Sequence, residues 1–513
     1  MLNRGATYSA HLRRWVSRSV ASIPSRRRLL NQVAGQQLRW AGGRQFPAHP
    51  RPQRNVPARQ FRSGGVQPSS AEPAIPGALG LPEVIIRSLI LLALCSATIA
   101  VLLNITLGTV ELTAGEESPK FHGFYSRFVT LCQLVGIASV LTAGFLACFQ
   151  RGVGWLGISS RLVMGLYAVA ACFWFVIGLG RMGRDEILTE PDSALTWFLC
   201  LGVAAGTRQG VWRQLGRIAG IAAWLLLPWM LYSLTMLKNY GRYDGVNPQV
   251  MYLSLVLWFA CYYLLSTPGA AWLPRAARSI PLLGCFFVAV FNQGRGWTIQ
   301  CILVFLLLAA RPLFLREAKA ASNLLKTGVV AVLALATVFF LLLLFHPLAI
   351  KGWIARASED TRTGQYKEFF SQVQVADLIT GKGPGAGYAF DDRFSNYRSF
   401  DNQFIWMLFK GGFLIALGYT VLVIFPGFRL FFRARNERDY AAASTLILWS
   451  LGLAGLSTYL NIGFSTQNYF IIVLAGYCHW RLAAQPSEVP IRGWHMLPLP
   501  RTRSNTSSTP ART

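Results

Sequence analysis

The stretch from residue 378 to 412 combines a glycine-rich turn, a run of charges and the start of an apolar helix; it reads LITGKGPGAGYAFDDRFSNYRSFDNQFIWMLFKGG. Glycines that alternate with Lys382 and Pro384 suggest a phosphate-binding loop before a helix. A Walker A loop, however, needs GxxxxGK[ST] after a strand, and a dinucleotide-binding loop needs GxGxxG in a βαβ unit. Neither context is present, so we do not expect nucleotide binding. We expect the glycines to form a tight turn that approaches neighbouring backbone closely and presents amide donors.

The helix that follows this turn begins at a pair of polar residues, Asp401 and Asn402. Either side chain is suited to cap the helix, whose first amides and positive dipole end then point outward. A capping role alone would explain Asp401. Lys410 lies about two turns deeper in an otherwise apolar helix, where it pairs with an acid, touches an anion or marks a wet cavity.

A second candidate for chemistry is Arg295, in the turn NQGRG at 292–296 between the apolar limbs 279–293 and 296–312. Each limb has about 15 apolar residues, or about 22 Å of helix, which is less than the bilayer core of about 30 Å. We therefore expect the turn to lie below the outer surface, with Arg295 in a wet pocket or against an anion. The alternative is that the limbs reach the interface and Arg295 extends to water.

The elements that position these residues are apolar helices. The chain has 513 residues, of which 53% are hydrophobic and only 14% charged. Apolar runs long enough to cross a bilayer recur along it. The runs are 84–106, 128–149, 161–180, 193–206, 216–237, 249–266, 279–293, 296–312, 326–347, 402–427, 441–459 and 463–480. The sequence therefore predicts an all-α polytopic membrane protein with about twelve transmembrane helices in residues 84–481.

The charges between the runs predict the topology. The connections 207–217, 267–278, 311–326 and 428–440 are basic, whereas the intervening connections carry acids. By the positive-inside rule, the basic connections and both termini are cytoplasmic. The loop 348–401, between the ninth and tenth helices, is then periplasmic, and its length indicates a functional segment or a small domain.

The net charge of +28 is explained by this pattern and by the N-terminal segment, which has thirteen arginines and two acids in residues 1–83. No nucleic-acid-binding motif accompanies the charges, so we expect no nucleic-acid partner. We expect 1–83 and 482–513 to be disordered cytoplasmic tails. A start codon placed too far upstream and an organellar transit peptide are alternatives for 1–83.

The span from about 280 to 425 resembles the O-antigen ligase and O-antigen polymerase family. Members carry an arginine between two central helices, which matches Arg295 in NQGRG. They carry a second arginine several residues before an aromatic residue, which matches Arg362 in TRTGQY. A GxGxG turn follows, matched by TGKGPGAGY, and then a His-Asn pair that opens an apolar helix. Here that pair is Asp401-Asn402, followed by QFIWMLFKGG.

The resemblance implies transfer of a glycan from undecaprenyl pyrophosphate to a sugar hydroxyl, on the periplasmic face of the bacterial inner membrane. Arg295 and Arg362 would bind the leaving pyrophosphate, and the cationic Lys382, Arg393 and Lys410 would contact the substrate. The chemistry requires no metal or other cofactor. The partners implied are the lipid-linked oligosaccharide, the bilayer, and a flippase and a chain-length regulator of the same pathway.

The catalytic pair departs from the family at its first residue. Asp401 stands where ligases commonly have histidine, and with Asn402 it would orient or deprotonate the acceptor hydroxyl. A carboxylate at a helix N-terminus is a weaker base than imidazole at neutral pH. His346, at the outer end of the ninth helix, is an alternative base, although an interfacial packing role would also explain it.

These features favour a polymerase that joins lipid-linked repeats into exopolysaccharide or O-antigen. The nearest alternative is an O-antigen ligase. Twelve helices also suit a transporter, but a major-facilitator architecture would carry its long loop in the cytoplasm, between two six-helix halves. A flippase for lipid-linked sugars would scatter cations through a lumen, whereas the candidate cations here gather near the periplasmic loop.

Overall fold

The structure is a computed structural model, in which all described residues belong to one compact unit, Gly77–Thr513. It describes residues 81–114, 124–150, 156–182, 194–236, 248–267, 272–291, 294–316, 320–358, 361–390, 394–397, 400, 402–456 and 467–485. The predictions of disordered tails at 1–83 and 482–513 fall almost wholly outside these residues, apart from the helical positions 81–83 and 482–484.

Apolar helices make up nearly all of this unit. The helices before the long loop are α3 (Leu81–Ala114), α4 (Phe124–Phe149), α5 (Ile158–Arg181), η2 (Ala194–Gly202), α7 (Val203–Gly206), α8 (Gln209–Met236), α9 (Pro248–Leu265), α10 (Trp272–Phe291), α11 (Arg295–Phe314) and α12 (Ala320–Phe345). The loop and the helices after it are α13 (Pro347–Ser358), α14 (Thr361–Gln372), α15 (Val375–Thr380), β1 (Tyr388–Phe390), β2 (Phe394–Tyr397), α16 (Gln403–Tyr419), η3 (Thr420–Ile424), α17 (Phe425–Phe431), α18 (Glu437–Leu451), η4 (Gly452–Leu456) and α19 (Gln467–Ala484).

Among the described residues, eight helices are long and apolar enough to cross a membrane. They are α3, α4, α5, α8, α10, α11, α12 and the continuous segment Gln403–Phe431. The remaining predicted runs coincide with the shorter apolar helices Trp197–Gly206, Val256–Leu265 and Tyr469–Ala484, and with α18 and η4. The prediction of an all-α polytopic membrane protein is confirmed at this level, and the count of twelve crossings stays a prediction.

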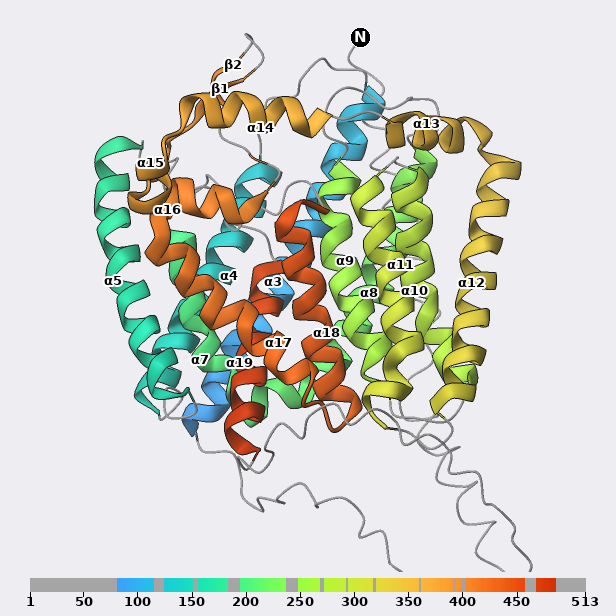
Figure 1. Cartoon of the computed structure of the whole chain (residues 1–513), viewed down its shortest axis with the longest axis horizontal. Helices are drawn as coiled ribbons and strands as arrows, with labels where there is room; N and C mark the ends of the chain where they lie inside the picture. Colours follow the sequence, from blue (N-terminus) through green and yellow to red (C-terminus); the bar gives the residue numbers. More distant parts are fainter. Residues whose placement is uncertain are drawn as a thin grey trace, which may run out of the picture. The chain divides into compact units, whose positions relative to one another are not determined.

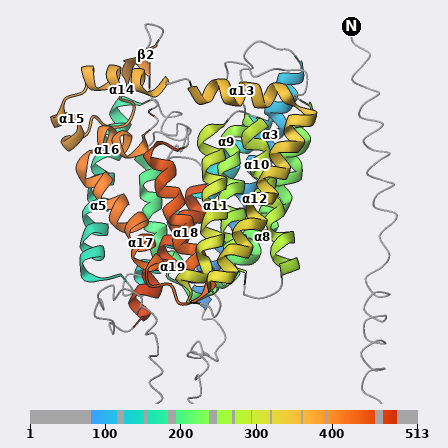
Figure 2. The same cartoon turned by 45° about the vertical axis from the view of Figure 1, so that its right-hand side comes forward.

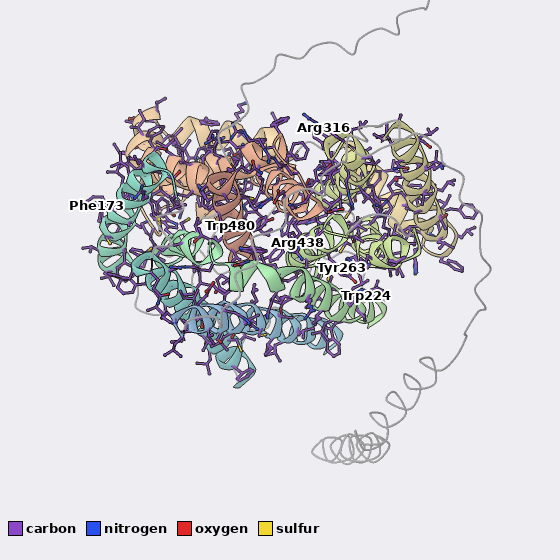
Figure 3. All side chains as sticks on the ribbon, turned by 90° about the horizontal axis from the view of Figure 1, so that it is seen from below. Phe173, Trp224, Tyr263, Arg316, Arg438 and Trp480 are labelled. Carbon is purple, nitrogen blue, oxygen red and sulfur yellow. The ribbon has the colours of Figure 1, made fainter. Side chains whose placement is uncertain are left out.

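The helices pack in two groups that meet at α3, α18 and α19. Helices α8 to α12 contact one another in chain order, and α18 joins them by packing on α9. On the other side α5 packs on η2 and α16, and α19 packs on α7 (Figures 1 and 2). Seen from the end opposite α13 and α14, Phe173 of α5 and Trp224 of α8 lie at the outer edge (Figure 3), where they are 59% and 40% exposed. Such a rim of exposed apolar side chains is typical of a lipid-facing surface.

Small residues let the short helix α7 pack directly against α19. A methyl group added at Gly206 would lie 2.3 Å from the carbonyl oxygen of Val473, and one at Gly476 would lie 2.2 Å from that of Val203. Such close backbone approach between helices is the contact that small residues allow in membrane proteins. All four residues of α7 are buried.

Charged side chains at the end opposite the long loop are built into helices rather than loops. Buried Arg311, within α11, donates from Nη1 to the carbonyl oxygen of Thr267 at 2.7 Å and from Nη2 to Glu437 at 3.2 Å. Arg481 donates to both carboxylate oxygens of buried Asp439, at 2.7 and 2.8 Å. Several arginines that the sequence analysis placed in connections therefore belong to helix ends.

The helices around Arg295 are longer than the predicted apolar limbs 279–293 and 296–312. Helices α10 and α11 have 20 residues each, because α10 begins at Trp272 and α11 runs from Arg295 to Phe314. At 1.5 Å per residue each is about 30 Å long, enough to reach the interface. These lengths do not support a deeply recessed Arg295.

The described part of the long loop 348–401, which we call the loop domain, has two parts: α13 packs on α10, α11 and α12, and the residues from α14 onward form a core with the start of α16. The helices α13 and α14 lie across the ends of the long helices, and α15 and an antiparallel hairpin of β1 and β2 follow (Figure 1). A separate core joins this domain to the start of α16; its buried members are Phe369, Val373, Tyr388, Phe400, Trp406 and Phe409. The hairpin is the one departure from an all-helical fold among the described residues.

Candidate functional site

The glycine-rich turn adopts a backbone that favours glycine. Gly381, Gly383 and Gly385 have φ values of 87°, 90° and 76°, in the left-handed region. The turn also packs closely against the backbone of α16, because a methyl group at Gly381 would lie 2.6 Å from the backbone nitrogen of Gly412. The prediction that these glycines serve shape and close approach is confirmed.

The partner of this turn is a break in α16. Gly412 has φ 71° and ψ −175°, which is not helical, so the carbonyls just before it need donors from elsewhere. The backbone N–H of Lys382 donates to the carbonyl of Phe409 at 2.7 Å, and that of Gly383 donates to the carbonyl of Lys410 at 2.8 Å. The amides of the turn thus cap a helix break. The sequence analysis expected one unbroken apolar helix here, and the Gly-Gly pair was the local signal of the break.

Helix α5 holds the turn and the break together. The indole Nε1 of Trp174 donates to the carbonyl of Gly411 at 3.0 Å, and Arg181 Nη1 donates to the carbonyl of Lys382 at 2.5 Å. A methyl group at Gly383 would lie 2.7 Å from Trp174 Cζ3, so the ring also contacts the turn. We call this arrangement of Trp174, Arg181, residues 381–385 and Gly411-Gly412 the α16 clasp.

The hydrogen bond from Trp174 gives a prediction for the α16 clasp. Trp174→Phe keeps an aromatic ring but leaves the buried carbonyl of Gly411 without this donor, so we expect a loss of about 1–2 kcal/mol in the free energy of unfolding. The measurement is SDS-induced unfolding in mixed micelles. Trp224→Phe is the matched control, because Trp224 is 40% exposed at the outer edge of α8. An equal effect of the two substitutions would contradict the assigned bond.

The two lysines of this region bind the loop itself. Lys410 is buried, its ammonium group donates to the carbonyl of Ala386, and it lies over the ring of Trp406 at 4.5 Å. Lys382 Nζ pairs with Asp377 Oδ1 at 2.8 Å, and its side chain is 49% exposed. The substrate-binding roles of Lys382 and Lys410 stay predictions. In the structure both side chains form contacts within the loop and α16.

The pair at Asp377 predicts a pH dependence of the loop. The hydrogen bond from Lys382, and then that from the backbone N–H of Gln374, lower the pKa of Asp377 below its ordinary value of 3.8. A depressed carboxyl pKa stabilises the fold above the ordinary value, and this stabilisation is lost as the pH falls through the lowered pKa. We expect limited proteolysis of the loop to accelerate over that acidic window in the native protein. In Asp377→Asn this acceleration should be absent. If the variant shows the same pH profile of proteolysis as the native protein, the Asp377–Lys382 pair does not cause the pH dependence.

The start of α16 is capped as predicted, by the second residue of the Asp-Asn pair. Asn402 Oδ1 accepts from the backbone N–H of Phe404 at 3.1 Å and of Ile405 at 3.3 Å. Gln403, which is buried, donates from Nε2 to the carbonyl of Phe400 at 2.6 Å. These bonds fix the first turn of α16 beneath α14. Asp401 lies outside the described residues.

Arg295 and His346 lie on the other side of the loop domain. Arg295 is the first residue of α11 and is partly buried. His346 follows α12 directly, and its ring contacts Phe291 at the end of α10 edge-on, with centroids 5.1 Å apart. Helix α13 packs against both α10 and α11. The structure therefore places His346 beside the end of α10, at Phe291, four positions before Arg295 in the chain.

Gln300 is a residue of this region that the sequence analysis did not single out. It lies in α11, five positions after Arg295, and is fully buried. Neither polar atom of its amide has a hydrogen-bond partner in the described part of the chain. A glutamine in an apolar transmembrane run was the available signal, because polar groups inside a membrane are rare and costly.

The remaining predicted site residues are not tested by the geometry. Arg393 lies outside the described residues, and Arg362 is placed in α14 without a description of its side chain. Trp174 and Arg181 of the α16 clasp were also missed, since nothing near them in the sequence indicates a contact with a segment about 200 residues away.

Comparison with known proteins adds no assignment. No protein-family profile matches the chain, and no curated protein sequence matches it.

Proposed function

We propose that this protein is a membrane glycosyltransferase that polymerises oligosaccharide repeats carried on undecaprenyl pyrophosphate, on the periplasmic face of the bacterial inner membrane. The product would be an exopolysaccharide or an O-antigen, and both termini would be cytoplasmic. One observation supports this most: two parts of the same loop pack on the two helix starts. Helix α13 packs against α11, which begins with Arg295, and α14 shares a core with the first turns of α16, which Asn402 caps. An arginine and a helix N-terminus suit an anionic lipid-linked donor.

In the proposed reaction the acceptor hydroxyl oxygen attacks the anomeric carbon of the donor sugar. The bond between that carbon and the pyrophosphate oxygen breaks, and the hydroxyl proton passes to a base. Negative charge builds on the leaving undecaprenyl pyrophosphate, so the transition state gains from fixed cations and donors. Arg295 and Arg362 would supply this stabilisation, and the buried amide of Gln300 would add a donor below Arg295.

Two residues are candidates for the base. Asp401 directly precedes the cap of α16, and a position at that helix start would suit contact with the acceptor hydroxyl. His346 contacts Phe291, which lies four positions before Arg295 in the chain. The base must contact the acceptor hydroxyl, whereas Arg295 would contact the donor pyrophosphate, so the two residues need different positions. We therefore favour Asp401 as the base, with His346 as the alternative.

The α16 clasp has a part in this proposal although it contacts no substrate. It fixes the direction of the first two turns of α16, because the turn 381–385 caps the carbonyls before Gly412. A catalytic helix start must be held to within about half an ångström of its working position. The loop domain and the clasp would supply that rigidity.

The experiment that tests the proposal compares glycans of cells that carry the native gene, a deletion, or the deletion with a plasmid copy. A polymerase predicts that the deletion leaves single repeats in place of long chains. Retained long polymer that is no longer attached to its lipid acceptor would indicate the ligase alternative instead. Unchanged chain length and attachment in the deletion would contradict both.

A further inference from the structure

The loop domain exposes large apolar side chains although it lies beyond the long helices. On α13 and α14 they are Leu348 (79% exposed), Ile354 (57%) and Phe370 (48%); on α15 they are Val375 (73%) and Ile379 (61%). Large apolar side chains at this exposure in a water-facing domain mark an interaction surface.

The first part of this surface continues the lipid-facing surface of α12. Only 11% of the apolar window of α12 is buried, and the side that does not pack on α10 and α11 faces outward. Its last residue, Phe345, is 72% exposed, and Leu348 follows three residues later at 79%. Helix α13, which includes Ile354, then runs across the helix ends near the level at which α12 ends (Figures 1 and 2).

The second part lies at the end of α5. Pro384 packs on Gly178 of α5, where an added methyl group would lie 3.5 Å from its Cγ, and Arg181 holds the carbonyl of Lys382. The outer face of α5 exposes Val176 (66%) and Leu179 (54%) at this same end. Helix α15, directly before the turn, is thereby fixed at the end of another lipid-facing helix.

Val375 and Ile379 are four positions apart, so they share one face of α15. Lys382 and Asp377 provide charges nearby, and the exposed Lys351 does so on α13. Helices that lie across the helix ends and combine exposed apolar side chains with charged ones are typical of elements that rest in the bilayer interface.

We propose that α13 and α15 rest in the headgroup layer of the membrane, with Leu348, Ile354, Val375 and Ile379 inserted at the boundary with the acyl chains. The occupant of this surface is phospholipid, since both segments continue surfaces that already face lipid. The loop 348–401 has seven basic and seven acidic residues, so apolar contact rather than attraction to anionic headgroups holds it there. The loop domain then lies against the membrane on the side where a lipid-linked donor would arrive, although the inference does not depend on the proposed activity.

The test places the photoreactive residue p-benzoylphenylalanine at position 375 or 379 of the full chain, in nanodiscs of phosphatidylcholine with or without phosphatidylglycerol. Position 364 is the control: a Cβ at Gly364 would meet nothing within 4 Å, and the position shares a face of α14 with Lys367 and Glu368. After illumination, mass spectrometry measures the fraction of each peptide that carries a lipid.

We expect lipid adducts at 375 and 379 at about ten times the yield at 364 or more, and equally in both lipid mixtures. Equal yields at all three positions would overturn the proposal. Adducts that form only with phosphatidylglycerol would also overturn it. A cross-linked product of twice the mass of the chain would overturn it too, because the surface would then bind a second copy of the protein. Because both test positions are exposed on one short helix, each is an independent check if the variant at the other fails to fold.

Discussion

Arg295→Ala should lower the rate of polymer formation by about 100- to 1000-fold, the usual cost of removing one group that stabilises charge in a transition state. The arginine begins α11 at the end of the bundle that the loop domain covers, where the leaving pyrophosphate would lie in the proposed reaction. Its removal should slow chemistry without unfolding the protein, because it lies at a helix end. The measurement is the initial rate of chain growth per folded protein.

Two further variants make the Arg295 result specific. Arg295→Lys keeps the charge but not the paired geometry of the guanidinium, so it should recover only part of the rate. Lys326→Ala removes an exposed cation near the start of α12, at the opposite helix end from His346, and should leave the rate unchanged. Arg362→Ala should resemble Arg295→Ala. A native rate in Arg295→Ala would remove this residue from the mechanism.

Gly412→Ala should destabilise the protein by about 3 kcal/mol or more. The backbone angles of Gly412, φ 71° and ψ −175°, are essentially confined to glycine and cost an alanine about 1–3 kcal/mol. The new methyl group would also lie 2.6 Å from the carbonyl oxygen of Thr380 and 2.7 Å from that of Ile379. Both carbonyls belong to backbone next to the glycine-rich turn, so relief requires the α16 clasp to open. SDS-induced unfolding measures the loss, and faster proteolysis within 373–400 would locate it.

The control for Gly412 is another glycine in a helix. Gly165, in α5, has nothing within 4 Å of an added Cβ and no left-handed backbone angle. Alanine there should be neutral or stabilise by up to about 1 kcal/mol, because glycine is the poorer helix former. Equal losses at 165 and 412 would show that helix composition, and not the clasp, determines the effect at 412.

The sequence predicted well what depends on local pattern. The described part of every predicted apolar run is almost wholly helical. In a membrane an apolar segment must satisfy its own backbone hydrogen bonds, and a helix does so. Asn402 caps α16 as its side chain type and position indicated. The alternation of glycines also predicted a tight, closely packed turn, which the φ values confirm.

The features that could not be predicted from the sequence depend on contacts between distant segments. The break at Gly412 exists together with donors from residues 382 and 383 and from Trp174, and periodicity carries no information about such partners. The first turns of α10 were missed because Arg275 and Arg278 indicated a loop, whereas both belong to the helix. The hairpin of β1 and β2 is short and lies among charges, so no alternation marked it.

The identity of the base is the main chemical question that the proposed function raises. If Asp401 is the base, its carboxylate must be held where the acceptor hydroxyl arrives, and the α16 clasp is what fixes that helix start. If His346 is the base, the reaction centre lies nearer the α10–α11 turn. Separate tests of Asp401→Asn and His346→Gln would distinguish the two sites, since only the residue that takes the proton should be needed for chain growth.

The most direct test of the proposed function is chain growth by the purified protein in proteoliposomes, with an undecaprenyl-pyrophosphate-linked repeat as the only substrate. The account predicts a ladder of longer lipid-linked glycans and the release of one undecaprenyl pyrophosphate for each bond formed, both absent with Arg295→Ala. A donor left unchanged by the native protein, or a normal ladder from folded Arg295→Ala, would contradict it.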